Sequence, residues 1–230
     1  MPPPDALAPL DALPDGAAHP LRPGLTVLRV PKRRYRKGNT YALDLPDGGV
    51  ALVDAVHKVT APALVQHLRQ RPVRALLITH RDLLNQAFGP PNLLSHCFGG
   101  APVVVHPADA VHPGTTSLEA AADLLAQLGI AAHAVPGHTP GSVAYEATAQ
   151  RLLFAGDAVV GRPYGSDPAE RGASHPPIAR EDWPAFVEGW NAIPGPFEAV
   201  LPLHGEPILG SDSLDVARAA ATDPARVMQL

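Results

Sequence analysis

Two histidines and an aspartate follow apolar segments at widely separated points of the chain, and these residue types can bind a metal ion. His80 ends the stretch "LLITH", His138 lies in "PGHTPGS", and Asp157 lies in "FAGDAV". Neutral imidazoles and a carboxylate are suitable ligands for Zn²⁺, Fe²⁺ or Mn²⁺. Polar side chains at the ends of buried strands can converge on one edge of a sheet. We therefore expect these three side chains to share a metal site.

His204 belongs to the same strand-end pattern as His80, His138 and Asp157, and together with Asp82 it is a candidate for proton transfer. Asp82 lies two residues after His80, and His204 follows an apolar run in "PLHGEP". A carboxylate side chain is shorter than an imidazole, so we expect Asp82 to reach the metal only through a water molecule or after its loop moves inward. His204 is an additional ligand, an outer hydrogen-bond donor or an acid–base group. We assign both residues as catalytic candidates. A single loop histidine is usually structural or solvated, and it is the repetition at strand ends that favours a site.

The segments around these residues read as short strands and helices in alternation. Turn residues 46–49, "PDGG", separate two apolar stretches and predict a β-hairpin, and a second hairpin is expected around Ala149. Short apolar runs predict further strands at 74–79, 102–106, 131–135 and 199–203. Helical periodicity and capping signals predict helices at 61–71, 116–128, from 183 onward and at 213–221. This order favours an α/β sandwich of sheets covered by outer helices.

Composition limits the classes of function. The net charge is −4, which favours neither nucleic acid nor anionic membranes as partners, and no apolar run is long enough to cross a bilayer. With one cysteine, Cys97, the chain forms no internal disulfide, and its start lacks the features of a secretory leader. We expect a cytoplasmic protein acting on a small-molecule substrate, with its oligomeric state left open. Residues 1–24 are expected to be an extended Pro/Ala-rich lead-in to a single domain over 25–230.

Five motifs in order make the sequence resemble the metallo-β-lactamase fold superfamily, which includes glyoxalase II-like hydrolases and persulfide dioxygenases. They are "NTYALDL…GGVALVDA", "LLITH", "PGHTPGS", "FAGDAV" and "PLHGEP", and the resemblance covers roughly residues 25–210. The resemblance implies a four-layer αββα sandwich, in which two mixed β-sheets are flanked by helices. It also implies a metal site at one edge of the sheets, and it places Asp54 at the family's aspartate after the second strand.

The sequence departs from the family in its metal loop. The family pattern T-H-x-H-x-D-H is represented here by His80, Asp82, Leu84 and Asn85. Leu84 has no donor atom, and an asparagine amide is a poor ligand beside an imidazole. The resemblance implies that the second-metal positions are Leu84, Asn85 and His204. We therefore predict at most one metal ion.

The remaining positions match the family's first-metal site. His80, Asp82 and His138 stand at the positions of its three histidines, and Asp157 matches the carboxylate that bridges both metals. We predict that His80, His138 and Asp157 hold one divalent ion, with zinc favoured over iron or manganese.

The sequence is compatible with three functions. Because one of them is non-catalytic, the sequence does not decide whether the chain is an enzyme. The first is a metal-dependent hydrolase of a small ester, thioester or phosphoester. The second is a non-catalytic pseudoenzyme or ligand-binding protein of the same fold, which holds no metal. The third is a persulfide dioxygenase-like oxidoreductase with a mononuclear iron, because two histidines and one carboxylate also form the facial triad of such enzymes. The polar segment 158–180 is either a substrate lid or a surface loop.

Overall fold

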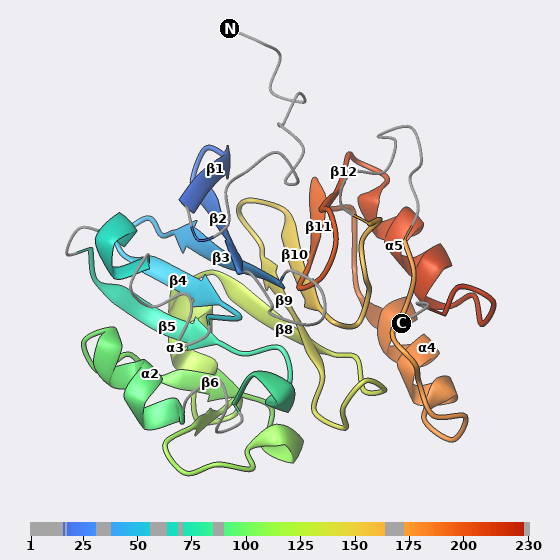
Figure 1. Cartoon of the computed structure of the whole chain (residues 1–230), viewed down its shortest axis with the longest axis horizontal. Coiled ribbons are helices and arrows are strands. Elements are labelled where there is room, and N and C mark those ends of the chain that lie inside the picture. Colours follow the sequence, from blue (N-terminus) through green and yellow to red (C-terminus); the bar gives the residue numbers. More distant parts are fainter. Residues whose placement is uncertain are drawn as a thin grey trace, which may run out of the picture.

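The structure is a computed structural model of the 230-residue chain (Figure 1). It describes residues 16, 18–30, 38–55, 64–68, 71–84, 90–163 and 173–227. Asn85, most of the predicted lead-in and residues 164–172 of the predicted lid segment lie outside the described residues. No helix within the described ranges is long and apolar enough to cross a membrane.

The first half of the chain forms a seven-stranded mixed sheet in the spatial order β1-β2-β3-β4-β5-β6-β7. Strands β1 to β4 are antiparallel neighbours, and β4, β5, β6 and β7 run parallel. The strands are β1 (Ala18–Arg22), β2 (Leu25–Val30), β3 (Gly38–Asp44), β4 (Val50–Val53), β5 (Val73–Leu77), β6 (Val103–Val105) and β7 (Thr116–Ser117).

The second half forms a five-stranded sheet in the order β12-β11-β10-β9-β8. Its only parallel pair is β10 with β11, which places the carboxyl ends of these two strands at the same edge. The strands are β8 (Ile130–Ala134), β9 (Val143–Ala147), β10 (Leu152–Gly156), β11 (Ala199–Pro202) and β12 (Ile208–Leu209).

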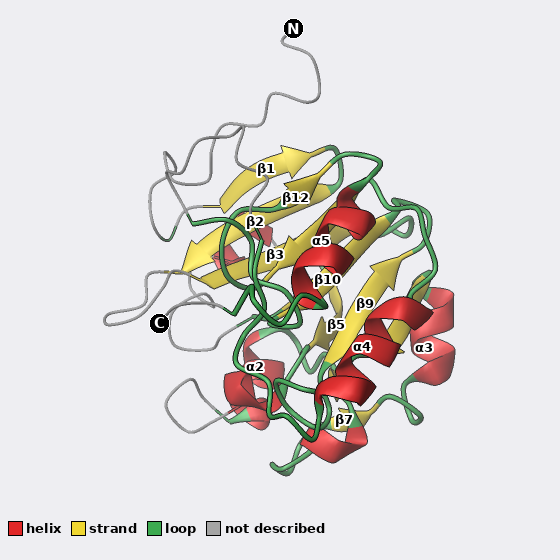
Figure 2. Ribbon diagram, turned by 90° about the vertical axis from the view of Figure 1, so that its right-hand side faces the viewer, coloured by secondary structure: helices red, strands yellow, loops and turns green. Residues whose placement is uncertain are grey.

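Helices cover the outer faces of both sheets, as Figures 1 and 2 show for α2 on one side and α4 and α5 on the other. Two short 3-10 helices, η2 (Arg81–Leu84) and η3 (Pro107–Asp109), follow β5 and β6. Residues 64–68 are also helical. The α-helices are α2 (Pro91–Cys97), α3 (Ala122–Gln127), α4 (Trp183–Ala192) and α5 (Ser213–Ala221).

Three apolar clusters correspond to the three interfaces between the layers. One lies between the sheets and includes Tyr41 and Phe154, whose rings are 5.5 Å apart. A second lies under residues 64–68 and α2, and a third joins the five-stranded sheet to α4 and α5 around the fully buried Trp190. Alternating strand residues therefore serve two different cores. The predicted four-layer αββα sandwich is confirmed.

Two sequence-based expectations differ from the structure. The lead-in was expected to end at residue 24, but β1 lies within it and pairs with β2, so the sheet begins earlier. A helix was expected over 116–128, but Thr116 and Ser117 form an edge strand beside β6, and α3 begins only at Ala122 without a side-chain cap. Pairing with the sheet outweighs the local capping signal at these residues.

Candidate metal centre

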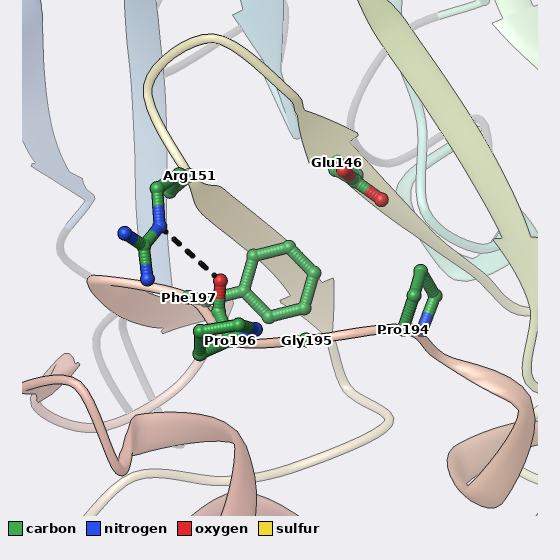
Figure 3. Close-up of a pocket in the computed structure, with 6 residues that line it drawn as sticks. All are labelled: Glu146, Arg151, Pro194, Gly195, Pro196 and Phe197. Atoms are coloured by element: carbon green, nitrogen blue, oxygen red, sulfur yellow. Dashed lines mark hydrogen bonds between the residues drawn. The ribbon is translucent and has the colours of Figure 1, made fainter.

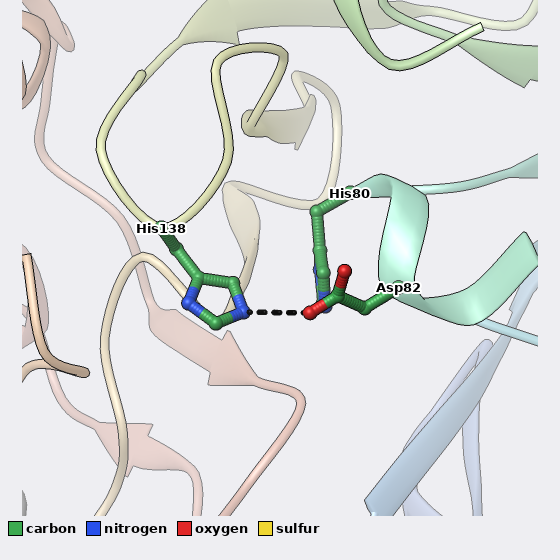
Figure 4. A group of neighbouring side chains, drawn as sticks. All are labelled: His80, Asp82 and His138. Carbon is green, nitrogen blue, oxygen red and sulfur yellow. Dashed lines mark ion pairs between the residues drawn. The ribbon is translucent and has the colours of Figure 1, made fainter. Parts of the chain in front are cut away.

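The candidate ligands meet at the carboxyl ends of strands from both sheets. His80 lies just beyond β5, and Asp82 follows it in η2. His138 lies in the loop between β8 and β9, and Asp157 and His204 follow β10 and β11. Figure 4 shows the side chains of His80, Asp82 and His138 turned toward one another from two separate segments. The fold thus brings together all five residues that the sequence selected.

Asp157 is the centre of this group. Its Oδ2 atom lies 3.7 Å from Nε2 of His80, 3.7 Å from Nε2 of His138 and 3.6 Å from Nε2 of His204. The Nε2 atom of His138 is also 3.5 Å from Oδ2 of Asp82. The rings of His80 and His138 meet edge to face, with centroids 4.9 Å apart.

These distances fit ligands of one metal ion better than hydrogen-bonded partners. They exceed the range of about 2.7–3.2 Å for N–H···O hydrogen bonds. Ligand atoms held at about 2.0–2.2 Å from a tetrahedral ion lie roughly 3.3–3.6 Å from one another. Ligand atoms of His80, Asp82 and His138 also lie within 4.8 Å of one another. The donor set therefore suits a divalent cation.

The exposed fraction of the side chains differs strongly across the site, and one side of the site is open to solvent. His80 is 2% exposed, whereas the side chains of His138 and Asp82 are 22% and 61% exposed. Asp157 and His204 are buried. The solvent side of the site is therefore the side of Asp82 and His138.

The orientation of His80 is set by Thr79, which precedes it in the "LLITH" motif and for which the sequence predicted no role. The Thr79 hydroxyl lies 3.0 Å from Nδ1 of His80 and donates to the carboxylate of Asp54, which also accepts the Thr79 backbone N–H. A hydroxyl has one proton, so when it donates to Asp54 it accepts from Nδ1–H of His80. The unprotonated Nε2 then faces Asp157, as a metal ligand requires.

Burial also shifts the protonation of this group of residues. Desolvation lowers the pKa of His80 from 6.5 to about 4, against the opposing charge of Asp157. The neutral imidazole that can bind a metal is therefore the stable form at neutral pH. Desolvation raises the pKa of Asp54 from 3.8 to about 7, although the Thr79 hydrogen bonds oppose this change.

Close packing between the sheets fixes the positions of the strand ends. Gly156 directly precedes Asp157 and has φ +55°, and a Cβ there would lie 2.2 Å from the Thr79 hydroxyl. The backbone N–H of Val143 donates to the Thr79 carbonyl at 2.9 Å, which ties β9 to the end of β5. The segments bearing His80 and Asp157 can approach this closely because residue 156 has no side chain.

Leu84, at one of the second-metal positions, is 1% exposed and packs in the apolar cluster beneath α2. It supplies no donor atom.

Two cavities lie elsewhere in the described part of the chain. One of about 70 Å³ is bordered by Glu146, Arg151 and residues 194–197, and there Arg151 Nε donates to the Pro196 carbonyl (Figure 3). Arg151 precedes β10 and Asp157 follows it, so this cavity lies at the opposite end of the strand from the candidate centre. A larger cavity of about 400 Å³ lies beside the start of α4, around His175 and Trp183.

Comparison with known proteins agrees with the fold. The family model of the metallo-β-lactamase superfamily matches residues 88–210, just over half of the chain, beginning after the segment that carries His80 and Asp82. A protein named hydroxyacylglutathione hydrolase from Anaeromyxobacter dehalogenans (strain 2CP-C) is 35% identical over 159 residues, which is 66% of this chain. The matched region spans 60% of the length of that relative.

Solved structures share the same architecture at low sequence identity. A metallo-β-lactamase from Erythrobacter litoralis with β-mercaptoethanol in its active site superimposes with a TM-score of 0.62 and 16% identity, covering 91% of this chain and 98% of that one. The mono-zinc form of FIM-1 from Pseudomonas aeruginosa gives 0.60 and 15%, covering 90% and 95%. A β-lactamase domain protein from Burkholderia ambifaria gives 0.58 and 18%, covering 94% and 79%.

Proposed function

The chain belongs to the metallo-β-lactamase superfamily, and from this membership we propose that it is a metal-dependent hydrolase with a single divalent ion. The supporting observation is the position of the Asp157 carboxylate, which faces three imidazoles at 3.6–3.7 Å. His80, His138 and Asp157 hold the ion in this proposal, and zinc is the first metal to test. The presence of Leu84 supports one ion rather than two.

A bound divalent ion lowers the pKa of a coordinated water toward about 7 and polarises a carbonyl or phosphoryl oxygen. The chain's own residues orient the reactants and move protons. Asp82, the most exposed carboxylate of the site, accepts a proton from a water on the solvent side. His204 is buried beside Asp157 and donates a proton to the leaving group.

The substrate in this proposal is a small ester, thioester or phosphoester. The name of the Anaeromyxobacter relative, hydroxyacylglutathione hydrolase, puts acylglutathione thioesters first among the compounds to test. The open side of the site near Asp82 gives such a substrate access without displacement of the buried His80.

Elemental analysis followed by activity assays tests the proposal. Protein purified from cells grown with added zinc and iron should hold about one metal ion per chain. It should also hydrolyse at least one thioester, ester or phosphoester without consuming O₂. Protein without metal and without turnover would contradict the proposal and favour a non-catalytic member of the family. Bound iron with O₂ uptake on a persulfide would favour an oxygenase.

A further inference from the structure

Asp109 is a fully buried carboxylate outside the candidate ligand set, and it lies where three segments meet. It ends η3, directly after β6 of the seven-stranded sheet. It is neither a predicted ligand nor a predicted proton carrier. A buried carboxylate is stable only when hydrogen bonds replace its lost hydration, so its partners show what it holds together.

The partners of Asp109 are neighbours of the metal ligands on two different loops. Its Oδ2 atom accepts the backbone N–H of Arg81 at 2.9 Å, and Arg81 lies between His80 and Asp82. The same oxygen accepts the hydroxyl of Thr139, the residue after His138. Its Oδ1 atom accepts the backbone N–H of Gly141 at 2.9 Å.

The loop between β8 and β9 is shaped to receive this carboxylate. A Cβ at Gly141 would lie 2.6 Å from Cγ of Asp109, so the glycine permits the close approach. The Thr139 hydroxyl donates its proton to Asp109 and is left to accept from the Ser142 hydroxyl at 2.9 Å. Ser142 in turn accepts the Thr139 backbone N–H at 3.0 Å, so it is part of the turn.

We propose that Asp109 is a positioning residue that ties the segment bearing His80 and Asp82 to the loop bearing His138, and so fixes the separation of these ligands. The two segments come from different sheets, and the hydrogen bonds of Asp109 connect them without involving the metal ion. Ligands held at the correct separation bind an ion without a loss of loop freedom at the moment of binding. The inference rests on the proposed function only for its effect on metal affinity.

The first experiment measures the Zn²⁺ affinity of Asp109→Asn by competition with a chelator. The variant is nearly isosteric, but an NH₂ group replaces one carboxylate oxygen. A hydrogen-bond donor then faces another donor where aspartate presented an acceptor. Affinity should fall by about 10- to 100-fold, the range for residues that orient metal ligands. The matched control is Asp123→Asn, which changes an exposed aspartate of α3 and should leave affinity within about twofold. An affinity for Asp109→Asn equal to that of the control would overturn the inference and leave the proposed function intact.

A second measurement does not depend on metal. Backbone amide exchange in the metal-free protein should be selectively faster at Arg81 or at Gly141 in Asp109→Asn, because the NH₂ group replaces one of the two carboxylate oxygens and the N–H that faced this oxygen loses its acceptor. If the wild-type chain binds no metal, the proposed function fails and this measurement alone decides the role of Asp109. Unchanged exchange at both amides would then overturn that role.

If Asp109→Asn fails to fold, the Thr139 pair takes its place. Thr139→Val removes the hydroxyl that reaches Asp109, and Thr139→Ser keeps it. The valine variant should lose at least about fivefold in Zn²⁺ affinity and the serine variant should stay within about twofold. Equal affinity in the two variants would count against the inference.

Discussion

At the scale of single residues, the proposal gives the histidines different roles. His80 and His138 hold the ion, and His204 donates a proton. His138 and His204 both approach Asp157 Oδ2, but only His138 belongs to the group with His80 and Asp82 whose ligand atoms lie within 4.8 Å of one another. Two alanine variants at equivalent distances from Asp157 can therefore have different effects on metal content and on turnover.

We expect His138→Ala to reduce bound metal from about one ion per chain to a small fraction of that, with loss of turnover. His204→Ala should keep its metal and lower kcat by about 10²- to 10⁴-fold, the usual contribution of a general acid. Elemental analysis and steady-state kinetics measure both, with the exposed His96→Ala on α2 as control. Loss of metal in His204→Ala would instead make His204 a ligand.

The buried carboxylate of Asp54 gives the metal-free protein a pH-dependent stability. Its pKa in the folded state is about 7, against 3.8 for the ordinary side chain. The folded state therefore keeps this proton after the unfolded state has lost it. The contribution of Asp54 is greatest below about pH 4 and is lost as the pH rises to about 7, a total change of up to about 4 kcal/mol.

Asp54→Asn removes this titration. The free energy of unfolding of the wild-type protein, minus that of the variant, should fall between pH 4 and pH 7 and change little above pH 8. Urea denaturation of the metal-free proteins at several pH values measures the difference. A difference that stays constant with pH would mean that Asp54 is ionised throughout.

At the scale of elements, the close approach of β10 to the end of β5 makes Gly156 hard to replace. Gly156→Ala combines a positive φ with a Cβ 2.2 Å from the Thr79 hydroxyl. Gly129→Ala is the matched control, because Gly129 has φ +67° but open space around it. We expect backbone strain to lower the free energy of unfolding of both variants by about 1–2 kcal/mol. Overpacking should lower that of Gly156→Ala by roughly 1–3 kcal/mol more.

Chemical denaturation measures these losses, and metal titration shows whether the site is displaced. Because Gly156 and Thr79 adjoin Asp157 and His80, Gly156→Ala should also bind metal more weakly than Gly129→Ala. Equal stability and equal affinity in the two variants would show that the strand ends can move apart without effect on the site.

At the scale of the whole molecule, the candidate centre lies across the boundary between the two sheets. His80 and Asp82 come from the seven-stranded sheet, and His138 and Asp157 come from the five-stranded one. An ion bound by residues of both sheets binds the folded state and not the unfolded chain. At a free metal concentration 100 times Kd, the free energy of unfolding should rise by about 2.7 kcal/mol.

Calorimetry or urea denaturation with and without a chelator tests this linkage. The same measurement on Asp157→Asn should show little stabilisation by metal, because the variant loses the carboxylate charge that faces the three imidazoles. Stabilisation of this variant by the full amount would place the bound ion elsewhere.

The sequence by itself determined which residues belong to the candidate centre and in which type of fold they lie. Apolar runs, hairpin turns and the order of His80, His138, Asp157 and His204 are local features, because each depends on a few neighbouring residues. The closing helix at 213–221 was predicted for the same reason. The absence of a donor at Leu84 was also evident from its chemistry alone.

Only the tertiary structure decided how these residues are held. Thr79 lies in the "LLITH" motif and Asp109 lies in a stretch without a distinctive pattern, but the sequence predicted no role for either, because their partners are 25 and about 30 positions away in the chain. The edge strand at Thr116 and the strand within the lead-in likewise depend on neighbours from other parts of the sequence. Local residue patterns specify strands and ligand types, whereas the distances between ligands arise from contacts between segments that only folding brings together.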